Sequence, residues 1–276
     1  PNRYGGISDE LGMCVLSGKG NGGTAGIYAK KEGYYGSSGY SIRFTNVTGV
    51  VWRRWQPWNP AIHVKMKRIE KPIPLHAKNM FRHMMPQEDE PVGFDLLRGD
   101  WVAPYGQGMH SDFLITMHQH PKRIVEKKGI HRSYDVTLYD IRLTVQGAGE
   151  GDGFIEVPFP VRPGGSSLRM PRHAPPDGYR PAVTKRNYRD SIDSTTRHNV
   201  DENMNYFFRV RTVLDKDGRV ESALYGKIHG DFQLDHNGAF GFMYYLNPTP
   251  NDRNLEFDRD QNLFKNLPPD QRVTMP

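Results

Sequence analysis

The chain has 276 residues, of which 36% are hydrophobic, and its formal net charge is +6. No stretch approaches the roughly 18 apolar residues of a membrane-spanning helix, so we expect no transmembrane span. The 37 basic residues face 31 acidic ones and are spread along the sequence. This distribution is typical of a mixed, solvated surface, and we therefore expect no nucleic-acid partner.

The composition favours strands joined by many turns. Gly 29 and Pro 21 exceed average usage, while 11% aromatic residues argue against disorder. Cys14 is the single cysteine, so an internal disulfide and a cysteine-based zinc site are both excluded. Because cytosolic proteins usually carry several thiols, one cysteine favours an extracytoplasmic protein, either periplasmic or secreted.

The first predicted part is a glycine-rich N-terminal arm, residues 1–39, with one short strand at Met13–Leu16. Strand patterns begin after it at Ser41–Phe44 and at 50–52. They continue at Ile62–Lys67, where apolar and polar residues alternate. This period of two gives a strand one buried and one wet face, as in an antiparallel sheet.

The middle of the chain predicts fewer regular elements. Five prolines between 70 and 110 argue against long strands there. Phe113–Met117 reads as a strand that Pro121 ends soon afterwards. Tyr134–Val145 is a longer strand, whose alternation slips by one residue and predicts a β-bulge near Tyr139 and Asp140. The segment 158–203 is rich in Pro, Gly, Arg and Ser, and we expect a long connection there.

Two consecutive hairpins are the best-defined prediction. Residues 205–214 and 219–228 flank an Asp-Gly turn, and residues 231–234 and 239–246 flank an Asn-Gly turn. Both dipeptides tolerate the positive φ that tight hairpin turns demand. Short helices are conceivable only at 190–199 and 258–267.

Together these patterns predict an all-β protein: an antiparallel β-sandwich with long irregular loops and extended N- and C-terminal arms. The sandwich domain should span residues 40–246, including the connection 158–203. Residues 247–276 should form a C-terminal arm, since their apolar residues occur singly and cannot make a core. Such an arm must lie across its own domain or across a neighbour.

The histidines are the first candidate site. His118 and His120 are two residues apart, so on one strand they point the same way and could share a metal ion. His110 lies upstream and is the third candidate ligand. The alternative is a strand end with exposed, polar histidines, and eleven histidines in the chain make close pairs expected by chance. We expect no cofactor.

A tryptophan–arginine cluster is the least ordinary feature of the sequence: Trp52, Arg53, Arg54, Trp55 and Trp58. One interpretation is that Trp52 or Trp55 fills the core beside a surface arginine. A second is a protein interface, because Trp and Arg are enriched in binding hot spots. A third is a flat platform for sugar rings.

Trp101 and Tyr105 lie in a loop that could line a pocket, or that could simply be a turn held by Trp101. No motif for nucleotide binding or nucleophilic catalysis is completed by its sequence context. We therefore expect a non-enzymatic interaction protein that docks on a larger protein assembly through its arms and the tryptophan–arginine cluster. The alternatives are a glycan-binding or glycan-active protein and a histidine-ligated metal enzyme.

Overall fold

The computed structural model describes residues 2–18, 23–46, 55–128, 133–159, 164–190, 195–198, 200–201 and 203–276; for residues 46, 55, 121–128, 133–137 and 195–198 it describes the backbone alone. The chain divides into two compact units. Unit 1 comprises residues 1–69 with 162–167, and unit 2 comprises 70–161 with 168–276. The boundary falls at 69/70, whereas the sequence suggested that an arm ends at 39.

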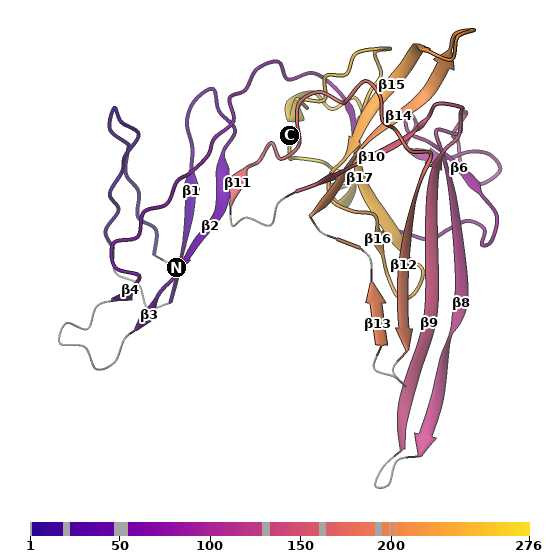
Figure 1. Cartoon of the computed structure of the whole chain (residues 1–276), viewed down its shortest axis with the longest axis horizontal. Coiled ribbons are helices and arrows are strands. Elements are labelled where there is room, and N and C mark those ends of the chain that lie inside the picture. Colours follow the sequence, from indigo (N-terminus) through magenta and orange to yellow (C-terminus); the bar gives the residue numbers. More distant parts are fainter. Residues whose placement is uncertain are drawn as a thin grey trace. The chain divides into compact units, whose positions relative to one another are not determined.

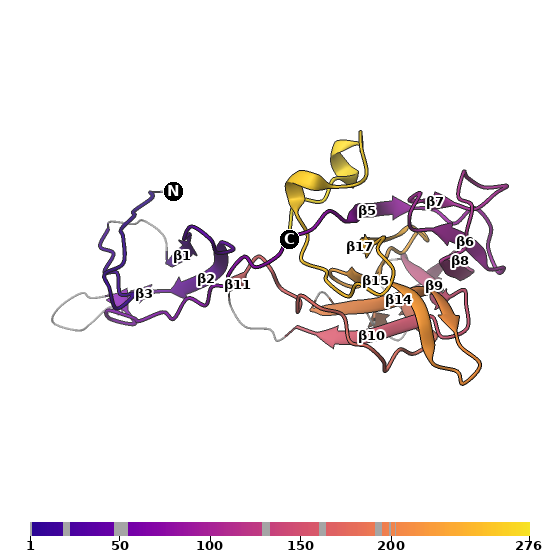
Figure 2. The same ribbon diagram turned by 90° about the horizontal axis from the view of Figure 1, so that it is seen from above.

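Unit 2 is an antiparallel β-sandwich of two six-stranded sheets, as the sequence predicted (Figures 1 and 2). The first sheet contains β5 (His76–His83), β10 (Gly153–Pro158), β14 (Met204–Leu214), β15 (Val220–Ile228), β16 (Gln233–Leu234) and β17 (Phe240–Asn247). The second contains, in spatial order, β13 (Thr195–His198), β12 (Ala182–Asp190), β9 (Ser133–Gly147), β8 (Phe113–Lys128), β6 (Val92–Asp95) and β7 (Asp100–Trp101).

The core between these sheets is built largely from aromatic side chains. Phe113 packs edge-on against Phe208 at 5.2 Å between ring centroids, and Phe232 lies 5.4 Å from Phe242. All four rings are buried. Alternation along each strand brings such residues to the inner faces, where large rings supply much of the buried apolar area.

Both predicted hairpins are confirmed. β14 pairs with β15 and β16 pairs with β17, in each case antiparallel. Gly218 and Gly238 take positive φ values of 75° and 81° in the two turns. In each turn the backbone amide of this glycine donates a hydrogen bond to the backbone carbonyl of the aspartate three residues before it.

Several expectations about the strands were wrong. Residues 76–83 form β5 despite the nearby prolines, and the supposed connection 158–203 contains β11, β12 and β13. Thr195–His198 is a strand where a helix was conceivable. Ile62–Lys67 does alternate in exposure but forms no ladder, since its Lys65 carbonyl and amide bond to the side chains of Ser37 and Tyr40.

The predicted bulge lies in the partner strand. β8 passes through Pro121 and continues to Lys128, so this proline does not end the element. The register runs from His120 opposite Asp140 to Arg123 opposite Leu138, which places one extra residue in β8. A bulge accommodates a proline because the extra residue needs no ladder hydrogen bond. The β8–β9 hairpin extends past the end of β12 (Figure 1).

Unit 1 has strands but no apolar core among its described residues. Its strands are β1 (Thr24–Ala29), β2 (Ser37–Arg43), β3 (Thr45–Asn46), β4 (Trp55–Gln56) and β11 (Gly165–Ser166). They form a three-stranded sheet, β1-β2-β11, and a β3–β4 pair. The predicted strand at Met13–Leu16 is not formed. Ser37 is the one described residue of this unit that is fully buried, and it is polar.

The C-terminal segment, residues 247–276, lies across its own sandwich. Leu255, Phe257 and Val273 are buried, and the Asn262 side chain bonds to both backbone groups of Ala77 in β5. Its two single-turn 3₁₀ helices are η1 (Arg259–Gln261) and η2 (Pro269–Gln271). Figure 2 shows this segment in yellow beside β5. Within the described ranges, no helix has the length and apolar character needed to cross a bilayer.

Glu256 is expected to hold this segment in place, and Glu256→Ala should destabilise unit 2 by about 2 kcal/mol. Its buried carboxylate accepts the amides of Glu70 and Lys71 at 2.9 Å each and pairs with Arg172 at 3.3 Å. Removing it takes away the acceptor of both amides and one of the ion pairs of Arg172, which also pairs with Glu70. Urea unfolding measures the loss, and Asp260→Ala, at an 86% exposed side chain, is the matched control with no expected effect. Equal effects of both substitutions would contradict the assignment.

Candidate functional site

The outer face of the second sheet carries polar side chains in matching positions on three strands. Phe113, Ile115 and Met117 of β8 are buried against the core. His118 and His120 point to the opposite side because their positions are even along the same strand. In the β8–β9 register His118 lies opposite Arg142, and His120 lies opposite Asp140. The strand pairing therefore places two imidazoles, a guanidinium and a carboxylate on one face.

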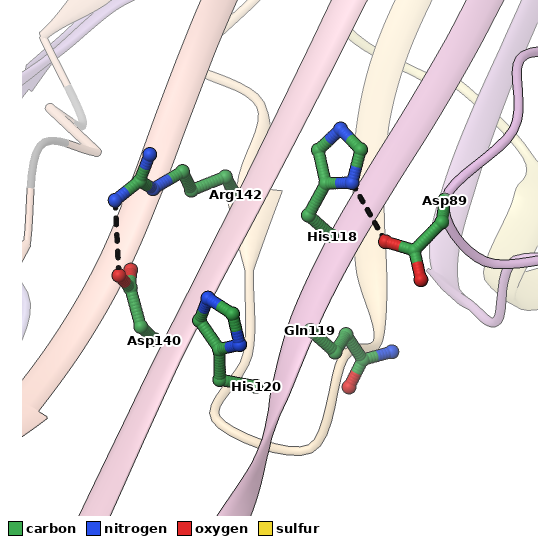
Figure 3. A pocket seen from close by; sticks show the side chains of 6 residues that line it. All are labelled: Asp89, His118, Gln119, His120, Asp140 and Arg142. Carbon is green, nitrogen blue, oxygen red and sulfur yellow. Dashed lines mark hydrogen bonds and ion pairs between the residues drawn. The ribbon is translucent and has the colours of Figure 1, made fainter.

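These residues line a pocket of about 260 Å³. Figure 3 shows its six lining residues, which are Asp89, His118, Gln119, His120, Asp140 and Arg142. Five of them come from β8 and β9, the two strands of the hairpin. Asp89 comes from the loop before β6, and this loop is fixed to the edge of β8 by the hydrogen bond from the Asp89 amide to the Met117 carbonyl, 2.9 Å.

Ion pairs orient the side chains of the pocket. The Nδ1 atom of His118 lies 2.7 Å from an Asp89 oxygen. Asp140 accepts two hydrogen bonds of 2.7 Å from Arg186 on β12 and one of 3.2 Å from Arg142. The bonds from Arg186 hold the pKa of Asp140 below its ordinary value, and those from Arg142 add to this against the opposing effect of burial. Asp140 is therefore a carboxylate at neutral pH.

The third histidine of the predicted set lies elsewhere. His110 is exposed in the loop after β7, and its amide donates to Asp95. Among the residues that the structure describes, no group of three His, Cys, Asp or Glu side chains is arranged to hold a metal ion. His118 and His120 do share a face, but the oxygens of Asp140 already accept from arginines. The pocket therefore lacks a ligand set for a metal.

The tryptophan–arginine cluster falls largely outside the described part of the chain. Trp52, Arg53 and Arg54 are not described, and Trp55 is described only as backbone in β4. The Trp58 side chain is 60% exposed. The interpretation of this cluster as core or as interface therefore stays a prediction.

Trp101 is buried in the sandwich, with 8% of its surface exposed. Its ring packs edge-on against Phe94 at 5.3 Å and against Phe240 at 6.1 Å. This packing fits the interpretation in which Trp101 holds the turn, and little of the indole surface is accessible to a ligand. Tyr105 is 42% exposed and donates its hydroxyl to Gln87.

Sequence reasoning missed four members of the pocket: Asp89, Gln119, Asp140 and Arg142. The break in alternation near Asp140 could be seen in the sequence. The strand register that places Asp140 opposite His120 could not. Comparison with protein-family models finds no family that matches the chain. Searches among curated proteins and among solved structures likewise find no similar protein.

Proposed function

We propose that this chain is a non-enzymatic interaction protein that docks on a larger protein assembly through unit 1. The observation that carries the proposal is the exposure of its apolar side chains. Ile7 is 96% exposed, Leu11 86% and Val15 83%, and Met13 and Tyr28 are exposed by more than 60%. Four of these large exposed apolar side chains lie between residues 7 and 15, and such a concentration is typical of a site of protein contact.

The apolar residues lie on a preformed turn. The Asp9 amide donates to the Met13 carbonyl at 2.9 Å, and the Gly12 amide donates to the Asp9 carbonyl at 3.0 Å. The Asp9 carboxylate also accepts the amides of Leu11 and Met13. Residues on both sides of this turn lie close together, as a Cβ on Gly6 would meet the Cys14 sulfur. A turn held by hydrogen bonds loses less entropy on binding than a free segment.

An exposed strand edge adds to this surface. β1 pairs with β2 on one side and stands at the edge of its sheet. Its sequence, TAGIYA, contains no charged residue and no proline, the features with which proteins usually blunt an edge. The partner that fits is therefore a protein that offers an apolar groove or an extended strand. We place this assembly outside the cytoplasm, consistent with the single, exposed Cys14.

Site-specific photo-crosslinking in extracts of the native cells tests the docking proposal. A crosslinker at Ile7 or Val15 should yield one discrete high-mass product, because these side chains would be buried in the interface. A crosslinker at Lys216, in the exposed turn between β14 and β15, is the control and should yield none.

Charge substitution provides the second arm of the test. Val15→Asp should release the chain from the assembly on size fractionation, since burying an unpaired carboxylate is costly. The variant should keep the unfolding curve of unit 2, which residue 15 does not belong to. A wild-type chain that fractionates as a monomer in native extracts, with no product from Ile7, would refute the proposal.

Glycan binding is the second candidate function, favoured by the 60% exposed indole of Trp58. An exposed indole can stack on a sugar ring. Binding to a glycan panel that Trp58→Ala abolishes would support this candidate. Binding that the substitution leaves unchanged would count against Trp58 as the platform.

A further inference from the structure

The pocket on the outer sheet face differs from an ordinary salt-bridge cluster because some of its hydrogen-bonding groups remain available to a ligand. Asp140 directs both oxygens at arginines, and Asp89 directs one at His118. By contrast, within the described part of the chain Arg142 makes one ion pair, through Nη2, and a guanidinium has five N–H donors. Its side chain is 51% exposed beside the pocket. The open hydrogen-bonding capacity is thus mainly that of donors.

The two histidines add further donors. With its Nδ1 atom held by Asp89, His118 keeps Nε2 for a ligand, and half of its side chain is exposed. His120 is exposed and lines the same pocket. In Figure 3 the side chains of His118, His120 and Arg142 stand on the same side of the β8 and β9 ribbons. Three donor groups from adjacent positions therefore line one pocket.

The charged groups around the pocket are close to balanced. The two carboxylates Asp89 and Asp140 face the two guanidiniums Arg142 and Arg186. Glu88 lies nearby and accepts from Gln119. Open hydrogen-bond donors, rather than an excess of positive charge, therefore distinguish the pocket.

We propose that this pocket binds an oxyanion, namely the carboxylate, phosphate or sulfate group of a small ligand. Arg142 supplies a planar fork of N–H donors that suits such a group, and His118 and His120 supply the remaining hydrogen bonds. Asp89 and Asp140 act as positioning residues, which hold His118 and Arg142 toward the space. A volume of about 260 Å³ admits an inorganic anion or a single acidic sugar and is small for larger ligands.

Titration of the full chain with sodium sulfate, followed by histidine side-chain NMR, tests the site directly. Sulfate keeps its double charge between pH 5 and 8, so any change of affinity in this range arises from the protein. We expect saturable shifts of the His118 and His120 signals with one dissociation constant for both, because the two side chains line the same pocket. Chloride at equal ionic strength is the control for screening.

Substitutions assign the binding to the pocket. Arg142→Gln should weaken sulfate binding about tenfold or more, because it removes a charge-assisted donor. His120→Ala, at an exposed position, should reduce the affinity because it removes one of the proposed donors. Arg82→Gln removes an exposed arginine paired with Asp235 and lies outside the lining, so it should leave binding unchanged.

The source of the oxyanion is distinguished by comparing inorganic phosphate, glucuronate and glucose. Binding of glucuronate in preference to phosphate identifies an acidic sugar, and the reverse identifies a phosphate; both results support an oxyanion site. No saturable binding of any of these anions at pH 5.5 would overturn the proposal. So would anion binding that Arg142→Gln and His120→Ala both leave intact, or histidine shifts produced by zinc and not by anions.

Discussion

Replacing Arg211 with methionine is expected to destabilise the sandwich by about 3–5 kcal/mol, because it leaves two buried carboxylates unpaired. The Arg211 Nε atom lies 2.7 Å from an oxygen of Asp112, and Nη2 lies 3.1 Å from an oxygen of Asp95. Asp112 is fully buried and Asp95 is 1% exposed. These carboxylates also accept hydrogen bonds from backbone amides between residues 96 and 110. The substitution should therefore destabilise this loop as well.

The two carboxylates respond differently to burial. Burial raises the pKa of Asp112, and the hydrogen bond and charge of Arg211 oppose this rise only in part. For Asp95, burial also acts to raise the pKa, but amide donors, led by Met109, together with Arg211 outweigh it and lower the pKa. In the Arg211→Met variant, Asp112 is therefore expected to take up a proton more readily. The destabilisation should be largest near pH 7 and should shrink toward pH 4.

Urea unfolding at pH 7 measures the effect of Arg211→Met. The matched control is Arg82→Met, which removes an ion pair whose side chains are 56% and 45% exposed, and which should cost less than about 1 kcal/mol. The double variant Arg211→Met with Asp112→Asn should recover part of the stability, because one of the orphaned charges is gone. A loss for Arg211→Met no larger than that of the control would show that this cluster does not support the fold.

The parts of the fold that the sequence predicted correctly are those specified by local signals. The β14–β15 and β16–β17 hairpins combine alternating residues with glycines at the positive-φ positions of their turns, Gly218 and Gly238. The alternation along β9 likewise identified a long strand. Each signal lies within about ten residues and needs no knowledge of the rest of the chain.

The strand β12 was missed because its inner face is partly polar. Lys185 and Asn187 point into the sandwich, where Lys185 pairs with Asp231 at 2.8 Å and Asn187 donates to the Leu234 carbonyl. Their partners are more than 40 residues away in the sequence. These two buried polar residues interrupt the alternation of apolar and polar residues along the strand. Only the tertiary structure shows the partners that allow them to be buried.

The candidate pocket could be predicted only in part. Because His118 and His120 are two residues apart on one strand, we predicted that they share a face. In the structure both line the same pocket. The identity of their neighbours depends on the register of β9 and on the loop that brings Asp89 to the edge of β8. The exposure of Ile7 and Leu11 could not be predicted either, because the sequence alone does not show which apolar residues pack into a core.

Acidification between pH 6.5 and 4 is expected to destabilise unit 2 through two buried histidines. Burial lowers the pKa of His76 to about 4, with Asp95 opposing and Arg211 adding to the shift. Burial likewise lowers the pKa of His229 to about 4, and Arg169 and Lys227 add to it. Among the residues that the structure describes, His76 Nδ1 and His229 Nε2 are both buried without a hydrogen-bond partner, so a proton added at either atom would have no acceptor.

The direction of the effect follows from proton linkage. Below pH 6.5 the unfolded chain binds protons at both histidines, whereas the folded chain binds them only near pH 4. Stability is therefore full above pH 6.5 and falls as the pH decreases toward 4. Discounted for partial solvent access, each histidine accounts for a loss of about 2 kcal/mol over this range.

Substitution of His229 separates this contribution from that of the carboxylates. His229→Gln does not titrate, so the decrease of unfolding free energy from pH 6.5 to 4.5 should be smaller than in the wild type by about 2 kcal/mol. His236→Gln, at an exposed position in the turn before β17, is the matched control and should keep the wild-type slope. An unchanged slope for His229→Gln would mean that the acid sensitivity arises from carboxylates such as Asp95. Asp95 loses its stabilising ionised form only at a lower pH, because its pKa is itself depressed. The contributions of His229 and Asp95 are therefore separable by the pH at which stability is lost.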